Sequence, residues 1–223
     1  MLNVIENSRA AVRYIIRHLK KGNHKLPNTT IIFNAGPAKI CPSFLKGLCQ
    51  VLRRYCYAHR AELRFPATIL YRMRQYRITL TYCAETFAAA VLLHASRCKR
   101  VLDLFRINES GDFMDQSQVD WFARVTAILA AASIPIRSYC YTCRTDLNLN
   151  VLADTCRINL STDKVFEYNY IADPRFNRYK VIERSEYNNI VESDTVKKCA
   201  GDCKICTYCS DCSGVTIYAP YRK

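Results

Sequence analysis

The clearest chemical signal in the sequence is a run of closely spaced cysteines near its end. Cys199, Cys203, Cys206, Cys209 and Cys212 follow the spacing C-x3-C-x2-C-x2-C-x2-C. Repeated C-x2-C steps are typical of iron–sulfur clusters, whereas structural zinc sites more often use two such pairs separated by a longer loop. We expect the first four cysteines to ligate an iron–sulfur cluster, with zinc as the alternative, and the fifth to be dispensable.

A second group of cysteines has wider spacing, C-x7-C-x6-C, at Cys41, Cys49 and Cys56. Buried cysteine also behaves as a small apolar residue, so a core position is the alternative. On one unbroken helix the last two Cα atoms would lie about 10 Å apart, whereas two thiolates on one zinc lie within about 5 Å of each other. Shared ligation therefore requires a break, and the hypothesis is a second metal centre lined by Tyr57 and Arg60. The other cysteines are expected in the core: Cys83, Cys98, Cys140, Cys143 and Cys156.

An acidic loop follows one of the expected strands and contains Glu109, Ser110, Gly111 and Asp112. Parallel α/β sheets bind ligands outside the carboxyl ends of their strands. Two carboxylates around a Ser-Gly pair suit acid–base chemistry or cation binding. Glu109, Ser110 and Asp112 are therefore candidate catalytic residues, and Asn108 and Gly111 candidate cofactor-binding residues. The alternative is a tight turn with an aspartate that caps a helix.

A basic segment from residue 53 to residue 77 holds seven arginines and one acidic residue, Glu62, with tyrosines interleaved. Guanidinium groups neutralise phosphates and tyrosine rings stack on bases, so the segment is a candidate nucleic-acid or nucleotide surface. A solvated helical face is the alternative. The candidate contacts are Arg53, Arg54, Arg64, Arg72, Arg74 and Arg77.

Composition limits the class of protein. The 223 residues carry 33 Lys+Arg against 19 Asp+Glu, a net charge of +14, and half are hydrophobic, which excludes a disordered tail. Thirteen cysteines, an odd number in a chain of this length, argue against a disulfide scaffold. The first residues lack the pattern of a signal peptide, and no apolar stretch is long enough for a membrane span. We expect a soluble cytoplasmic protein with reduced thiols and no membrane partner.

The elements that position these residues follow from periodicity. A helix and a polar loop are expected in residues 1–28, and mostly helical structure from 42 to 98 with a break at Phe65-Pro66. A helix capped by Asp115 or Ser117 follows the acidic loop. Strands are expected at 29–34, 102–108, 136–142 and 156–161.

Strands and helices at this spacing predict an α/β fold with a mostly parallel, partial-barrel-like sheet and a cysteine-rich C-terminal lobe. The expected organisation is a leading helix and loop in 1–28, an α/β domain in 29–196 and a metal-binding tail in 197–223.

Four segments together resemble a known family. They are Cys56-Tyr-Ala-His-Arg-Ala-Glu62 with Phe65-Pro66, Phe105-Arg-Ile-Asn-Glu-Ser-Gly-Asp-Phe113, Tyr139-Cys-Tyr-Thr142, and Cys199-Ala-Gly-Asp-Cys-Lys-Ile-Cys-Thr-Tyr-Cys209. Their order and spacing resemble the bacteriophage gene product 88 family over about residues 30–220. The resemblance implies a phage protein acting in the cytoplasm of a bacterial host, where a host protein is a further candidate partner. The chain departs from the family at two positions, Asn108 for the usual histidine and Cys143 for the usual lysine.

A wider similarity concerns the order of the parts. A cysteine group, a strand with an acidic Ser-Gly loop and two further strands are similar in order to radical S-adenosylmethionine enzymes. That similarity implies a cluster with an open iron for S-adenosylmethionine and an auxiliary cluster on the tail. The wide spacing of Cys41, Cys49 and Cys56 departs from that superfamily.

The sequence thus predicts an iron–sulfur protein, as a redox or radical enzyme with its ligand site over the loop 109–112. The alternative is a zinc-stabilised, non-catalytic module that binds nucleic acid or a host factor.

Overall fold

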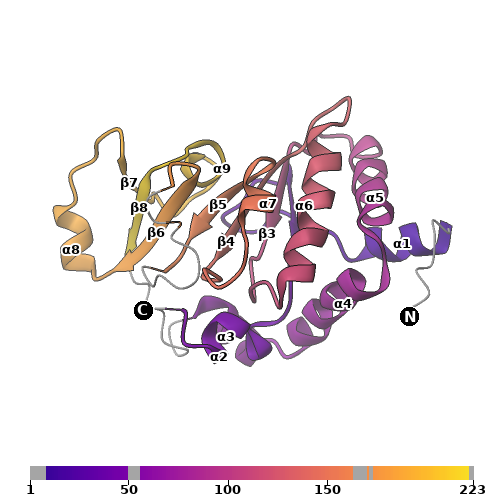
Figure 1. The fold of residues 1–223 in the computed structure, drawn as a ribbon, viewed down its shortest axis with the longest axis horizontal. Helices are drawn as coiled ribbons and strands as arrows, with labels where there is room; N and C mark the ends of the chain where they lie inside the picture. The colour runs from indigo at the N-terminus through magenta and orange to yellow at the C-terminus, as the bar shows by residue number, and fades with distance from the viewer. Residues whose placement is uncertain (1–8, 50–55, 163–169, 171–172, 221–223) are drawn as a thin grey trace.

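The computed structural model of the protein describes residues 9–49, 56–162, 170 and 173–220 (Figure 1). Its strands are β1 (Lys20–Lys21), β2 (Thr30–Phe33), β3 (Leu104–Ile107), β4 (Arg137–Thr142), β5 (Cys156–Leu160), β6 (Phe176–Ile182), β7 (Val196–Lys198) and β8 (Thr216–Pro220). Its helices are α1 (Arg9–Arg17), the 3-10 turn η1 (Ala38–Ile40), α2 (Pro42–Leu45), α3 (Tyr57–Arg64), α4 (Ala67–Thr81), α5 (Ala84–Ser96), α6 (Gln116–Ala130), α7 (Asn150–Ala153), α8 (Arg184–Asn189) and α9 (Tyr208–Asp211).

The strands form one open sheet in the order β1-β2-β3-β4-β5-β6-β8-β7. β1 is antiparallel to β2, and the other neighbouring pairs are parallel. The predicted α/β class and mostly parallel sheet are therefore confirmed, and the sheet does not close into a barrel. β8 pairs inside this sheet, so the cysteine-rich segment is joined to the α/β core at both ends.

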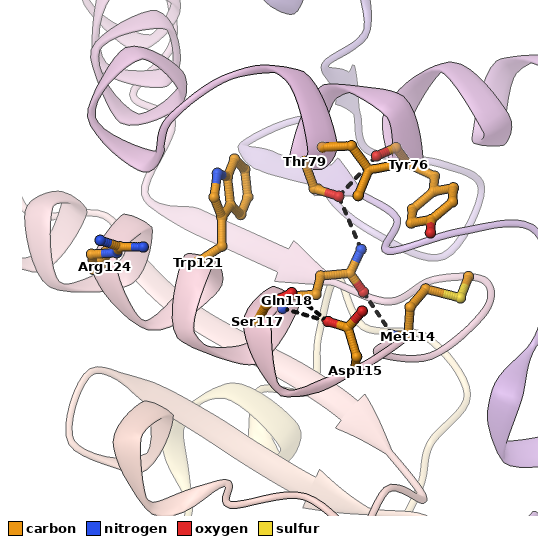
Figure 2. Close-up of a pocket in the computed structure, with 9 residues that line it drawn as sticks. Tyr76, Thr79, Met114, Asp115, Ser117, Gln118, Trp121 and Arg124 are labelled. Atoms are coloured by element: carbon orange, nitrogen blue, oxygen red, sulfur yellow. Dashed lines mark hydrogen bonds between the residues drawn. The ribbon is translucent and has the colours of Figure 1, made fainter. Parts of the chain in front are cut away.

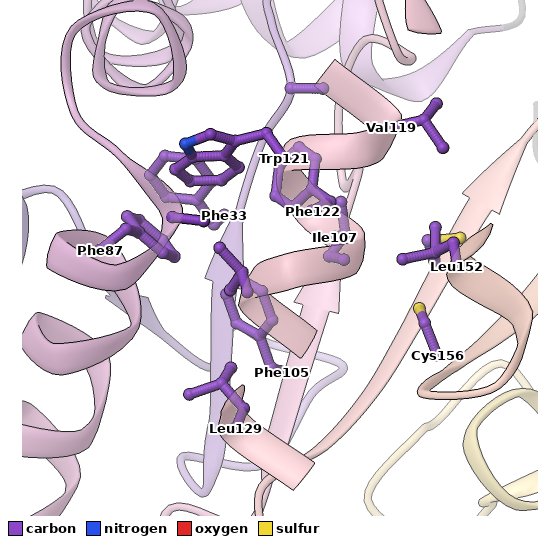
Figure 3. Packing of buried hydrophobic residues seen from close by; sticks show 14 of the residues in the cluster. Phe33, Phe87, Phe105, Ile107, Val119, Trp121, Phe122, Leu129, Leu152 and Cys156 are labelled. Atoms are coloured by element: carbon purple, nitrogen blue, oxygen red, sulfur yellow. The ribbon is translucent and has the colours of Figure 1, made fainter. Parts of the chain in front are cut away.

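One face of the sheet, the core face, carries the hydrophobic core (Figure 3). Phe105 of β3 is in register with Ile31 of β2, and partners in a parallel pair point to the same side. Helices α5 and α6 pack together on this side. The Phe87 ring of α5 lies 4.6 Å from that of Phe33 and 4.9 Å from that of Trp121, measured between centroids. Within the described ranges, no helix is long and apolar enough to span a bilayer.

The opposite face, which we call the polar face, presents alternate residues of the same strands. Register places Arg106 beside Tyr139, Tyr141 beside Asn159, and Asn159 beside Asn177. Tyr179 lies two residues beyond Asn177 on β6 and therefore shares its side. The polar face comprises Arg106, Tyr139, Tyr141, Asn159, Asn177 and Tyr179.

The tail cysteines reach the polar face because the strand order reverses at β8. From β2 to β6 each parallel strand is added on the same side of its predecessor, so right-handed connections put α5, α6 and α7 on the core face. β8 instead inserts between β6 and β7. The connection from β7 to β8 therefore crosses the other side of the sheet, and its helix α9 packs against β4 and β5.

Local signals in the sequence predicted strands β2, β3, β4 and β5 and the helical stretches around them, but not strands β1, β6, β7 and β8. Phe65 ends α3 and Pro66 precedes α4, which confirms the expected break. Asp115 caps α6 through a hydrogen bond from the Gln118 amide at 2.9 Å. β6 and α8 lie in a stretch that the sequence left without a pattern. Their residues are mostly half-buried or exposed, so the alternation that identifies a strand is weak there.

Candidate functional site

The segment with the tail cysteines is held on the polar face by two asparagines. The Asn159 side-chain amide donates to the Cys209 carbonyl, and the Asn177 side-chain amide donates to the Cys212 carbonyl, both at 2.9 Å. Both asparagines are fully buried, and Asn177 also donates to the Asn159 Oδ1 atom at 3.1 Å. Because buried amides are costly to leave unpaired, this ladder fixes the segment to the sheet.

The first four tail cysteines share one electrostatic environment. Burial raises the pKa of the Cys209 thiol to about 12, a hydrogen bond with Tyr141 opposes the rise, and the charges of Cys199, Cys203 and Cys206 add to it. Burial also raises the pKa of Cys203, with Cys199 and Cys206 again among its neighbours. The fifth cysteine of the run is not among the groups that act on either thiol.

Thiolates are soft donors that suit iron–sulfur clusters and zinc. In the described part of the chain, however, no three His, Cys, Asp or Glu side chains are close enough together to hold a metal ion as they stand. Ligation by these cysteines is therefore still a prediction.

A guanidinium lies beside the tail cysteines, on β3. The Arg106 Cζ atom is 5.0 Å from the centroid of the Tyr141 ring and 5.9 Å from that of Tyr139. Its Nη2 atom donates to the Tyr57 hydroxyl at 3.4 Å, and its charge lowers the pKa of Cys203. No role was expected from the sequence for Arg106, Tyr139 or Tyr141. The alternation of strand residues, with Tyr139 and Tyr141 on one side and Cys140 on the other, was the available signal.

The second cysteine group is only partly brought together. Burial raises the pKa of the Cys41 thiol to about 12, and the charges of Asp112 and Cys49 add to the rise. Cys143 is buried as predicted, but it follows β4 and shares a hydrogen bond with Cys49 that raises its pKa. Cys56 precedes α3 and is not among the groups that act on these thiols. Both Cys49 and Cys56 lie outside helices, and the chain between them is outside the described residues.

Asp112, a predicted catalytic residue, lies at the centre of a buried polar network. Its carboxylate accepts hydrogen bonds from the hydroxyls of Ser43 and Thr142 at 2.6 Å and from the Cys143 amide at 2.8 Å. Burial raises its pKa while these hydrogen bonds lower it. The side chain is only 3% exposed. Asp112 thus joins the loops that follow β3 and β4 to the start of α2.

The other residues of the acidic loop are engaged in the same way. Glu109 accepts from Asn23 at 2.5 Å and pairs with Lys20 at 3.5 Å. The Ser110 side chain is buried, and its hydroxyl donates to Glu62 at 3.4 Å. Gly111 has a φ of +69°, and a Cβ atom there would lie 2.3 Å from a backbone oxygen. These contacts position the loop.

Asn108, a predicted cofactor-binding residue, also stabilises the carboxyl ends of the strands. It adopts a φ of 65°, and its Oδ1 atom accepts from the Ala35 amide at 3.1 Å. Its side-chain amide donates to the Tyr141 carbonyl at 3.4 Å. Tyr57 donates its hydroxyl to the Glu109 carbonyl.

The arginine segment requires one correction. Arg72, predicted to contact nucleic acid, is 5% exposed, and its Nη1 atom lies 2.8 Å from Glu62 Oε1. Its guanidinium therefore forms a buried ion pair and does not face solvent, where a nucleic acid would bind. Arg60, Arg64, Arg74 and Arg77 are exposed, and Arg53 and Arg54 lie outside the described residues.

Comparison with known proteins decides the family. The profile of the family described as Gene product 88 matches residues 7–213. The chain belongs to the Gene product 88 family. The resemblance seen in the sequence is thereby confirmed over nearly the whole chain. No curated protein and no solved structure matches, so the similarity to radical S-adenosylmethionine enzymes gains no support.

The Gene product 88 match includes both cysteine groups and the acidic loop and ends before β8. A separate shallow cavity of about 260 Å³ lies between α4 and α6 in this chain (Figure 2). Gln118 lies in its wall, where it donates to Thr79 at 3.0 Å and accepts from the Met114 amide at 2.9 Å. Because the Gln118 amide is satisfied within the wall, we assign the cavity no ligand.

Proposed function

We propose that this member of the Gene product 88 family is an iron–sulfur redox protein. The observation that carries the proposal is the shared environment of Cys199, Cys203, Cys206 and Cys209 on the polar face. Their spacing is closer to that of iron–sulfur sites than to that of zinc sites with two separated pairs. Metal binding would draw the four thiols together and displace their protons, because thiolates are the ligands.

The surroundings of these cysteines suit a cluster more than a solvated thiol group. Tyr179 donates its hydroxyl to the Cys199 sulfur at 3.8 Å, and Tyr141 forms a hydrogen bond with Cys209. Hydrogen bonds to sulfur and partial burial are features by which proteins tune the potential of a cluster. The Asn159 and Asn177 ladder supplies the rigid support that a metal site needs.

The test is the metal content of protein purified without oxygen. We expect a brown protein with acid-labile sulfide, loss of both in Cys206→Ser, and retention of both in the matched control Cys212→Ser. If the protein is instead colourless and holds stoichiometric zinc that Cys206→Ser loses, the centre is a zinc site and not an iron–sulfur cluster. Retention of metal by Cys206→Ser would contradict the assignment of these cysteines as ligands.

Nucleic-acid binding is a second candidate function, and the exposed arginines of α3 and α4 favour it. Arg60, Arg64, Arg74 and Arg77 all reach the surface, and none forms an ion pair within the described residues. Exposed guanidinium groups without carboxylate partners are typical of a surface that neutralises phosphates.

Salt dependence tests this second function. Each phosphate neutralised contributes about −0.9 to the slope of log K against log salt on duplex DNA, or about −0.7 on single strands. The double variant Arg74→Ala/Arg77→Ala should flatten the slope without a change in metal content, whereas Arg184→Ala on α8 should have little effect. Absence of binding to DNA and RNA at low ionic strength would exclude the function and favour a host protein as the partner of this surface.

A further inference from the structure

Arg106 carries a positive charge that no carboxylate neutralises within the described residues. It lies in the middle of β3 on the polar face and is partly buried. Its Nε atom is buried without a hydrogen-bond partner. Its other polar contacts are with the neutral phenols of Tyr57 and Tyr139, and its guanidinium lies 5.0 Å from the centroid of the Tyr141 ring. A buried charge is costly unless it is paired. An anion bound to this guanidinium would therefore be favourable.

The nearby carboxylate of Glu109 is already committed. Glu109 receives a hydrogen bond from Asn23 at 2.5 Å and pairs with Lys20 at 3.5 Å. Its charge acts on Arg106, but no ion pair joins the two. In the metal-free protein the balance of charge around Arg106 therefore stays positive.

The surrounding tyrosines do not supply the missing negative charge. The pKa of an ordinary phenol is about 10. These phenols are neutral at physiological pH. Their hydroxyls can donate hydrogen bonds to a bound oxygen atom, and their rings offer flat apolar surface.

We propose that Arg106 binds the oxyanion of a small ligand, a phosphate or a carboxylate, on the polar face beside the tail cysteines. The planar fork of a guanidinium matches two oxygen atoms of either group. Tyr57 is 56% exposed and flanks Arg106 on the solvent side, where it can contact the rest of the ligand. This site goes beyond the proposed redox function and requires no particular metal.

The experiment is calorimetric titration of the purified protein at low ionic strength with inorganic phosphate, AMP and benzoate. The first two probes report on phosphate and the third on carboxylate. We expect at least one probe to bind saturably, and Arg106→Gln to weaken that binding about 10- to 100-fold because a charge-assisted hydrogen bond is lost. Arg106→Lys, which keeps the charge but not the fork, should fall between. Arg13→Gln, at an exposed position of α1, should bind as the wild type does.

Several outcomes would overturn the site. Absence of wild-type binding to all three probes would contradict the oxyanion site. Equal binding by Arg106→Gln and the wild type would place the anion elsewhere. If Arg106→Gln does not fold, as judged by circular dichroism, Tyr57→Phe provides the second test, and unchanged binding in it would count against the site. Binding by Cys206→Ser separates this proposal from the metal centre, because the oxyanion site should survive the loss of metal.

Discussion

The side-chain amide of Asn159 donates to the backbone carbonyl of Cys209 across 2.9 Å and so links the middle of the sheet to the cysteine segment. The same amide donates to the Cys140 carbonyl at 3.0 Å, and the Oδ1 atom accepts from Asn177. One buried side chain thus connects β4, β6 and the connection that crosses the polar face. The position of the predicted metal ligands depends on this contact.

Replacement of Asn159 by Ala should therefore loosen the cysteine segment. The change leaves buried partners unpaired, and each such group costs about 1–3 kcal/mol. We expect a lower free energy of unfolding in urea and faster proteolysis between residues 199 and 212. Asn189→Ala, on exposed α8, is the matched control and should change neither. An Asn159→Ala protein with wild-type stability and protease resistance would contradict the anchoring role.

The buried ion pair of Glu62 and Arg72 should contribute strongly to the stability of the fold, whereas the neighbouring exposed arginines should not. Glu62 also accepts from the backbone amides of Ala38 and Lys39 at 2.7 and 3.0 Å. Removal of one partner from a buried pair costs about 3–5 kcal/mol, so Arg72→Ala should lower the free energy of unfolding by that amount. The exposed Arg74→Ala should change it by less than about 0.5 kcal/mol. Equal effects of the two substitutions would show that Arg72 is not buried in solution.

Two glycines with similar backbone conformations should respond differently to alanine. Gly111 has a φ of +69°, and its added Cβ would lie 2.3 Å from the Gly36 oxygen, whereas Gly47 has a φ of +64° and open space. Gly47→Ala should cost about 1–2 kcal/mol from the left-handed conformation. Gly111→Ala adds the clash and should cost about 2–5 kcal/mol in the free energy of unfolding. Similar costs for the two would mean that the acidic loop does not pack against Gly36.

Two partly buried thiols should make the metal-free protein less stable at alkaline pH. The pKa values of Cys41 and Cys209 rise from 9.0 to about 12, chiefly through burial. Their contribution to stability is complete below pH 9 and is lost as the pH rises toward 12, because the unfolded chain releases these protons first. The slope is about 1.4 kcal/mol per pH unit for each thiol.

Urea unfolding at about pH 8.5 and about pH 10.5 measures this loss of stability. The double variant Cys41→Ser/Cys209→Ser has no thiol at either position, so its free energy of unfolding should decline less steeply. An equal decline in the variant and the wild type would show that other groups cause the alkaline loss.

The sequence by itself determined the elements whose signals are local. Asp115 before an apolar stripe marked the start of α6, and Pro66 marked the break between α3 and α4, because capping and proline geometry act within a few residues. The alternation of strands and helices along the chain predicted the parallel sheet, because two parallel neighbouring strands need a crossover connection, usually a helix. The spacing of the tail cysteines identified the group that shares one environment on the polar face.

Only the tertiary structure decided which polar residues are buried and what they contact. The sequence pattern predicts that Arg72 is a surface charge. In the structure it is buried in an ion pair with Glu62 of the preceding helix. Asn159 reads as a polar strand residue, yet the insertion of β8 between β6 and β7 brings Cys209 onto it. Nothing in the sequence marks Arg106 as a binding residue, and only the folded chain brings it beside Tyr57, Tyr139 and Cys203. Such contacts join residues far apart in the chain. Because the order of strands in the sheet determines them, local sequence patterns cannot predict them.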